Sequence, residues 1–295
     1  MALFSTTKHL LGMAMVLTAV ASSSAATSPG EAFVKASIAT DVTHFAPGKP
    51  FLAAITLTLE PEWHVYWINP GDSGLPTQIT WSLPDGWSSQ ALAMPVPKTF
   101  TQPGDIAGYG YENSVTFLAS ITPPLTATGP APLTATVSYL VCKDVCLPGK
   151  QTLSLTLQAA ADSTPVASPA GSAIATQAKL SLPASKPLSP QSTVDVTPTG
   201  FNIAARITNT QDASLPTSGS WQLLPFPDDS LEWQQLSATP DTAGIAISAK
   251  ARSLSQASHE PRFLLINTSP AGVRAGWEIV FPPVHPTQSK SPGGR

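Results

Sequence analysis

The feature that most constrains this chain is a pair of cysteines four residues apart, Cys142 and Cys146, the only two among 295 residues. Polar and apolar residues alternate before the pair, over 134–139, and after it, over 152–157. A period of two is typical of half-buried β-strands, so the cysteines are expected where an antiparallel strand pair turns. Opposed residues in such a pair have Cα atoms roughly 4.5 to 5.5 Å apart, which suits a disulfide.

A disulfide at this position would add little stability. The loop-entropy estimate for so small a ring is about 2 kcal/mol, and a chain of this length can bury a core without it. Redox chemistry therefore explains the pair better, and a purely structural hairpin bridge is the alternative. Lys143 would favour a thiolate and Asp144 would oppose it, so no strong depression of a cysteine pKa is expected.

The N-terminus predicts export from the cytoplasm. Residues 1–26 have the order of a secretory signal peptide, with Lys8 and His9, an apolar run over 10–21, and small residues over 22–26. The apolar run is too short to span a membrane and no later run is longer, so we expect a soluble mature chain. Export implies an oxidising compartment. Together with the cysteine pair it indicates a bacterial periplasm, with an extracellular site as the alternative.

Composition indicates an all-β protein that does not bind nucleic acid. Charged residues make up 11% of the chain and the formal net charge is −3, so neither a basic nucleic-acid surface nor a polybasic membrane anchor is present. Short alternating runs separated by prolines and glycines are typical of β-sandwiches. Such runs lie at 51–59, 63–67, 79–81 and 115–121. Their tryptophans, Trp63, Trp67 and Trp81, are expected in the core.

Two glycine-containing segments interrupt the strands. Residues 69–76 contain Gly-Asp-Ser-Gly, a string also found around protease nucleophiles, but a turn explains Ser73 better because no triad context precedes it. Residues 104–111 hold three glycines and two tyrosines, which predict an exposed loop. Tyr109 and Tyr111 either pack at a strand edge or form an aromatic lid over the sulfurs.

The second half of the chain differs from the first in composition and in the order of its predicted elements. Residues 161–192 are rich in Pro, Ala, Ser and Thr and predict a linker, with a short helical turn around 173–182. Strand patterns return over 193–284 and predict a second, smaller β-sandwich, which is followed by a polar tail over 285–295.

No metal or cofactor is expected. His44, His64, His259 and His285 are scattered, and none forms a local ligand pair with the cysteines. Two thiolates alone make an incomplete zinc site. Each of these histidines is expected to be a surface or strand residue.

Three ordered segments carry a resemblance to a known family. They are 63–76 (WHVYWINPGDSGLP), 108–111 (GYGY) and 139–146 (YLVCKDVC). They resemble the N-terminal periplasmic domain of the DsbD and ScsB group of thiol:disulfide interchange proteins, over roughly 33–157. The likeness is closer to the ScsB-like branch, since the best-known DsbD domain has a longer spacing between its cysteines.

The resemblance implies an immunoglobulin-like β-sandwich over 31–160 whose cysteine pair shuttles electrons. Its partners would be a membrane-embedded or thioredoxin-like reductase on one side and periplasmic disulfide isomerases or related thiol proteins on the other. It also implies that Cys146 forms the mixed disulfide and Cys142 resolves it.

In that family a cap loop shields the cysteine pair. By order along the chain it corresponds here to about 105–111, with Asp105, Tyr109 and Tyr111. The family's acidic pair in this loop is reduced to Asp105, and its cap aromatic is not matched one-for-one.

The membrane and thioredoxin-like domains expected next in the family are absent from this sequence, so electrons are expected to pass to or from another polypeptide. Two functions follow. The first is a periplasmic thiol:disulfide exchange protein of the protein-disulfide reductase type. The second is a non-catalytic binding or scaffolding β-protein with a structural disulfide, linked to copper tolerance as ScsB-like proteins are.

Overall fold

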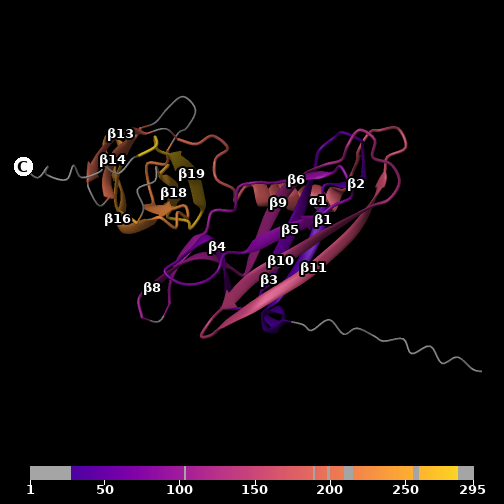
Figure 1. The fold of residues 1–295 in the computed structure, drawn as a ribbon, viewed down its shortest axis with the longest axis horizontal. Coiled ribbons are helices and arrows are strands. Elements are labelled where there is room, and N and C mark those ends of the chain that lie inside the picture. Colours follow the sequence, from indigo (N-terminus) through magenta and orange to yellow (C-terminus); the bar gives the residue numbers. More distant parts are fainter. Residues whose placement is uncertain are drawn as a thin grey trace, which may run out of the picture.

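Strands make up most of the computed structural model of this protein (Figure 1). The predicted signal peptide and polar tail lie outside the residues that it describes. Within those residues, no helix has the length and apolarity needed to span a bilayer. The described residues are 28–102, 104–188, 190–197, 200–208, 215–254 and 259–284.

The first domain consists of two β-sheets packed against each other. One sheet has the order β1-β3-β9-β6, and the other has the order β12-β2-β11-β10-β4-β8-β7, with β5 also paired to β10. A 3-10 helix, Pro29–Phe33, precedes β1. The strands are β1 (Val34–Thr40), β2 (Val42–Phe45), β3 (Phe51–Leu59), β4 (His64–Gly71), β5 (Gln78–Ser82), β6 (Ser88–Ala91), β7 (Lys98–Gln102), β8 (Ile106–Glu112), β9 (Ser114–Thr122), β10 (Ala131–Cys142), β11 (Cys146–Ala159) and β12 (Val166–Ala167).

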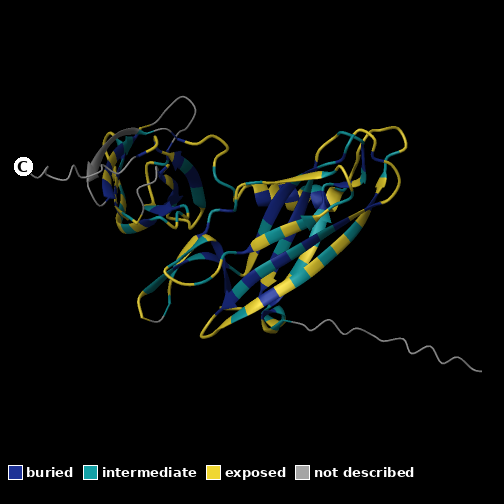
Figure 2. Ribbon diagram, viewed as in Figure 1, coloured by how far each residue is buried: buried dark blue, intermediate teal, exposed yellow. Residues whose placement is uncertain are grey.

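The core of this domain lies between the sheets, and the alternation in the sequence explains it. The odd-numbered residues of β3 are buried, and Ile55 and Leu57 share a cluster with Phe117 of β9 and Val137 of β10. Each fully buried Leu or Ile stabilises the fold by about 1.5–3 kcal/mol relative to an exposed position. Trp67 is also buried, as predicted. Figure 2 shows buried and exposed residues alternating along the long strands.

Part of the segment predicted as a linker is folded onto the first domain. Strand β12 pairs with β2, and helix α1 (Pro169–Lys179) packs on the first sheet. Ala175 and Ala178 of the helix form a buried cluster with Ala54 and Leu118. Small side chains allow the helix to approach the sheet closely. The Ala- and Ser-rich composition that indicated a linker is therefore the composition that this contact requires.

The helix begins four residues before the helical turn predicted around 173–182, and its first residues explain this start. Ser168 is the N-cap, and its hydroxyl accepts a hydrogen bond from the Gly171 backbone nitrogen (3.2 Å). Pro169 occupies the first helical position, where its missing N–H costs nothing. A Cβ at Gly171 would lie 1.8 Å from the Thr40 carbonyl oxygen, so only glycine permits this approach.

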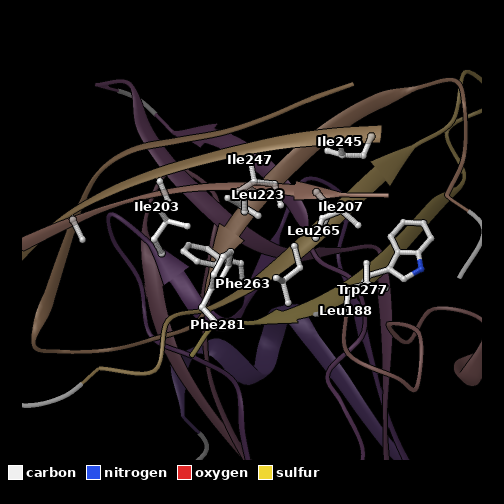
Figure 3. Close-up of a cluster of buried hydrophobic side chains, with 14 of the residues drawn as sticks. Leu188, Ile203, Ile207, Leu223, Ile245, Ile247, Phe263, Leu265, Trp277 and Phe281 are labelled. Carbon is white, nitrogen blue, oxygen red and sulfur yellow. The ribbon is translucent and has the colours of Figure 1, made fainter. Parts of the chain in front are cut away.

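The second domain is a smaller β-sandwich, as predicted. Its sheets have the orders β13-β14-β17-β16 and β15-β18-β19. Figure 3 shows the side chains between them, including Ile203, Ile247, Phe263 and Phe281. Most residues of strand β16 are exposed, so it contributes less to this core than its neighbours do. The strands are β13 (Gln191–Thr197), β14 (Gly200–Ile207), β15 (Ser220–Pro225), β16 (Leu231–Asp241), β17 (Gly244–Ser253), β18 (Arg262–Thr268) and β19 (Arg274–Val280).

Candidate functional site

The two cysteines face each other at the tip of the β10–β11 hairpin. Cys142 ends β10, Cys146 begins β11, and the two residues are opposed in the antiparallel register. Their Cα atoms are 4.2 Å apart and their sulfurs are bonded. Cys142 is fully buried, whereas Cys146 is exposed. The bridge therefore joins a protected residue to an accessible one.

Cys142 lies in a row of residues that crosses the sheet. The register places His64 of β4 opposite Cys142, and Glu112 of β8 opposite His64. Residues opposed in neighbouring strands point to the same face, so Cys146, Cys142, His64 and Glu112 share one face. Their sequence neighbours, such as Val65, point into the core.

The Tyr66 hydroxyl connects this row to the accessible cysteine. Its oxygen lies 4.0 Å from Cys146 Sγ, 3.3 Å from His64 Nε2 and 2.9 Å from Gln102 Nε2. An amide nitrogen only donates, so Tyr66 accepts from Gln102 and keeps its own hydrogen for His64 or the sulfur. Burial raises the pKa of Tyr66, and the hydrogen bond from Gln102 partly opposes this. Tyr66 is therefore protonated and a donor at neutral pH.

Phe100 of β7 covers the row. Its ring centroid lies 4.2 Å from that of His64 and 6.1 Å from that of Tyr66. A Cβ at Gly108, which is paired with Phe100, would lie 2.2 Å from the Phe100 ring. Glycine at this position allows the ring to lie against the neighbouring strand. Gly74 approaches Tyr66 in the same way, since a Cβ there would lie 2.5 Å from the Tyr66 ring.

The prediction of an irregular cap loop over 105–111 is wrong. Most of this segment is strand β8 (Ile106–Glu112), and Asp105 is an exposed turn residue with a positive φ of 58°. Side chains alternate across a strand, so Gly108 and Gly110 lie on the disulfide face and the tyrosines lie on the other.

The two tyrosines pack in the core rather than over the sulfurs. Tyr111 is buried, and its hydroxyl donates to the Pro95 carbonyl oxygen (2.8 Å). Tyr109 is partly buried against the same cluster. Burial raises the pKa of both phenols. The residues that cover the disulfide face are Phe100 and Gln102, which sequence reasoning missed because their facing depends on the pairing of β7 with β8.

The charged residues between the cysteines lie in solvent. Lys143 Nζ lies 2.6 Å from Glu62 Oε2. This hydrogen bond lowers the pKa of Glu62 and raises the pKa of Lys143. Asp144 is exposed. The Lys143 charge is therefore engaged by Glu62 and screened by water, which limits its effect on a thiolate.

His64 makes stability depend on pH. Burial lowers its pKa, and the Glu112 carboxylate partly opposes this. Below the unfolded pKa of about 6.5, the unfolded chain binds more protons at this residue than the native one does. The stability that the neutral His64 contributes is therefore present above that pH and is lost as pH falls through the folded pKa.

This pH dependence can be measured by urea denaturation. We expect the free energy of unfolding of the wild-type protein to fall between pH 7 and 5 more steeply than that of His64→Gln. Equal slopes would contradict this.

A second buried histidine lies away from the cysteines. His259 Nε2 is 2.9 Å from Ser253 Oγ, and its Nδ1 is 3.3 Å from Asp228 Oδ2 and 3.2 Å from Ser230 Oγ. The imidazole is 1% exposed, so a substrate has no access to it. These contacts tie the end of β17 to the turn before β16.

The disulfide lies apart from the cavity between the two domains. A cavity of about 740 Å³ opens between the two domains, with Trp67, Trp81, Met94 and Phe226 in its wall, and neither cysteine lines it. Within the described residues, no group of three His, Cys, Asp or Glu side chains is arranged to hold a metal ion. An exposed Cys146 that lies apart from this cavity fits contact with another protein better than with a small molecule.

These features define an immunoglobulin-like β-sandwich that presents a cysteine pair at one end and carries a second β-sandwich. Residues 31–158 match the family model described as thiol:disulfide interchange protein DsbD, N-terminal. The first domain therefore belongs to the DsbD N-terminal family.

A solved structure shares the fold across both domains. The crystal structure of the N-terminal periplasmic domain of ScsB from Proteus mirabilis has a TM-score of 0.62 at 15% identity, over 89% of this chain and 97% of that chain. Domains 5–6 of the S-layer protein SbsC are much less similar (TM-score 0.20, 8% identity, 84% of this chain and 97% of that chain). No curated protein matches the chain in sequence.

Proposed function

We propose that this protein exchanges thiols and disulfides with partner proteins in the bacterial periplasm through Cys142 and Cys146. The observation that carries the proposal is the asymmetry of the bridge, with Cys146 exposed and Cys142 buried beside His64. Exchange requires in-line attack on one sulfur, and access decides which sulfur is attacked. A structural bridge would gain nothing from this asymmetry.

The exchange has two steps. A thiolate of a dithiol partner attacks Cys146 Sγ, the bond to Cys142 breaks, and Cys142 leaves as a thiolate that takes a proton from solvent. The partner's second thiolate then attacks the partner sulfur of the mixed disulfide and releases Cys146. The partner becomes a disulfide, this protein becomes a dithiol, and two electrons have moved. The reverse sequence passes them to an oxidised substrate protein.

The buried polar side chains support the released thiolate of Cys146. The Tyr66 hydrogen lies within reach of Cys146 Sγ, and a hydrogen bond to a charged sulfur is stronger than one to a neutral sulfur. Gln102 holds the hydroxyl by donating to its oxygen (2.9 Å). Phe100 excludes water from the neighbouring His64 ring. The reaction needs no cofactor because the sulfurs themselves carry the electrons.

The family and the predicted signal peptide support the proposed location and partners. The Proteus mirabilis domain is described as periplasmic. We propose a thioredoxin-like domain or membrane electron-transfer protein as one partner, and disulfide isomerase-like or other thiol proteins as the other. The exposed Val145 between the cysteines offers such partners an apolar contact beside the reactive sulfur.

Trapping of the mixed disulfide tests this function. In Cys142→Ala the resolving thiol is gone, so Cys146 should form a stable mixed disulfide with an oxidised thioredoxin-fold protein. On a non-reducing gel we expect a band for the complex, which should separate into the two proteins when dithiothreitol reduces the disulfide. Cys146→Ala, which retains only the buried thiol, is the matched control and should form none. Absence of a complex with both variants, or equal complex with both, would contradict the proposal.

A further inference from the structure

The strands that cover His64 and Tyr66, beside the disulfide, contact the second domain with their opposite face. We call β7 and β8 the cover hairpin. Phe100 and Gln102 of β7 face the disulfide row. Thr99 directly precedes Phe100 and points the other way, where its hydroxyl donates to Gln222 Oε1 of β15 (3.2 Å). The cover hairpin therefore contacts the residues beside the disulfide with one face and the second domain with the other.

Asn69 makes a second polar connection. Its Nδ2 donates to the Pro225 carbonyl oxygen of the second domain (2.9 Å), and its Oδ1 accepts from the Gly71 nitrogen (3.0 Å). Gly71 pairs with Gly108 of β8. A connected set of contacts thus runs from the second domain, through the end of β4, to the strand against which Phe100 lies.

Asp72 strengthens this connection on the side of the cover hairpin. Its carboxylate accepts from the Ala107 nitrogen (2.9 Å), and its own backbone nitrogen donates to the Ala107 carbonyl oxygen (2.9 Å). Two hydrogen bonds between Asp72 and Ala107 therefore join β8 to the turn that follows β4. A displacement of that turn would move β8 with it.

Strand β4 also connects the two regions through its side chains. His64 and Tyr66 face the disulfide, while Trp67 faces the other way and stacks near Phe226 of the second domain, with 5.1 Å between ring centroids. Val65 and Trp67 share one buried cluster with Leu224, Leu264 and Ile266 of the second domain. An interface with a buried apolar core resists relative domain motion, so the second domain holds the strand that carries His64 and Tyr66.

We propose that the second domain acts as a brace, which keeps β4 and the cover hairpin in place beside the Cys142–Cys146 pair and so limits how readily the pair reacts. The proposal rests on the proposed exchange function, because a brace matters only if the pair reacts. It gives a role to a domain without a cysteine of its own. Asn69, Gln222 and Phe226 are its positioning residues.

The test measures chemical access to the disulfide in the full chain. Phe226→Ala removes a contact between β4 and the second domain, and the double variant Asn69→Ala/Gln222→Ala removes one contact from β4 and one from the cover hairpin. We expect the second-order rate constant for reduction of the disulfide by tris(2-carboxyethyl)phosphine to rise at least about fivefold, the lower end of usual coupling between sites. Hydrogen exchange in β7 and β8 should rise as well.

Two controls separate a brace from general destabilisation. Gln235→Ala changes an exposed residue of β16 in the second domain and should leave the rate unchanged. Leu231→Ala removes a buried side chain from the core of that domain, away from the interface, and should lower stability without a comparable rise in rate. Rates within twofold of wild type in the folded double variant, or an equal rise in Leu231→Ala, would overturn the brace.

The phosphine reacts without any protein partner. The experiment can therefore support the brace even if trapping of a mixed disulfide fails, and trapping can succeed if the brace is wrong.

Discussion

Cys146→Ala is expected to abolish electron transfer to a thioredoxin-fold partner while leaving the protein folded. Cys146 is the accessible sulfur, and the remaining Cys142 thiol is buried. Loss of a covalent nucleophile typically costs several orders of magnitude in rate, so we expect a fall of at least about 10³-fold. The measurement is the rate at which the pre-reduced protein reduces an oxidised partner. Alkylation of the partner's newly formed thiols monitors this reaction.

The fold should survive this substitution because the ring closed by the disulfide is small. Its loss costs about 2 kcal/mol in the loop-entropy model, while β10 and β11 remain paired along their whole length. Circular dichroism of Cys146→Ala should therefore match that of the wild-type protein. A folded variant that still reduces the partner at the wild-type rate would end the assignment of Cys146 as the exchanging residue.

Tyr66→Phe is expected to raise the pKa of the Cys146 thiol in the reduced protein. The hydroxyl is within 4.0 Å of Cys146 Sγ in the oxidised form and is the donor available to its thiolate. A hydrogen bond to a charged group contributes about 1.5–3 kcal/mol, and 1.36 kcal/mol corresponds to one pKa unit, so we expect a rise of about one to two units. The phenyl ring keeps its shape beneath Gly74, so packing is preserved.

The measurement is the rate of iodoacetamide alkylation of Cys146 against pH, in a Cys142→Ala background. Its midpoint should shift upward in Tyr66→Phe. Tyr139→Phe is the matched control, because the Tyr139 hydroxyl bonds Gln151 (2.5 Å) on the core face of the same sheet. Superimposable profiles for Tyr66→Phe and its background would show that the hydroxyl does not contact the thiolate.

Local alternation was sufficient to predict the elements that carry the cysteines. The runs on either side of Cys142 and Cys146 predicted a hairpin, and its register brings the two residues opposite each other. The same periodicity predicted β3 and the buried position of Trp67. These predictions succeed because a period of two fixes the face of each side chain within a strand, whatever the order of strands in the sheet.

The surroundings of the cysteines depend on strand order, which alternation does not contain. His64 lies opposite Cys142 because β4 pairs with β10, although the two residues are far apart in sequence. The family resemblance placed Tyr109 and Tyr111 in a loop over the sulfurs, with packing at a strand edge as the alternative, and strand β8 turns both toward the core. Phe100 lies over His64 through the pairing of β7 with β8.

The reduction potential of the Cys142–Cys146 pair tests the central claim most directly. The protein would be equilibrated with dithiothreitol or glutathione buffers, alkylated, and its thiol content read by mass spectrometry. A pair that opens and closes in use should have a potential above about −300 mV and should equilibrate with a thioredoxin-fold protein. A potential below about −300 mV, with no reaction with that protein, would mean that the bridge is structural.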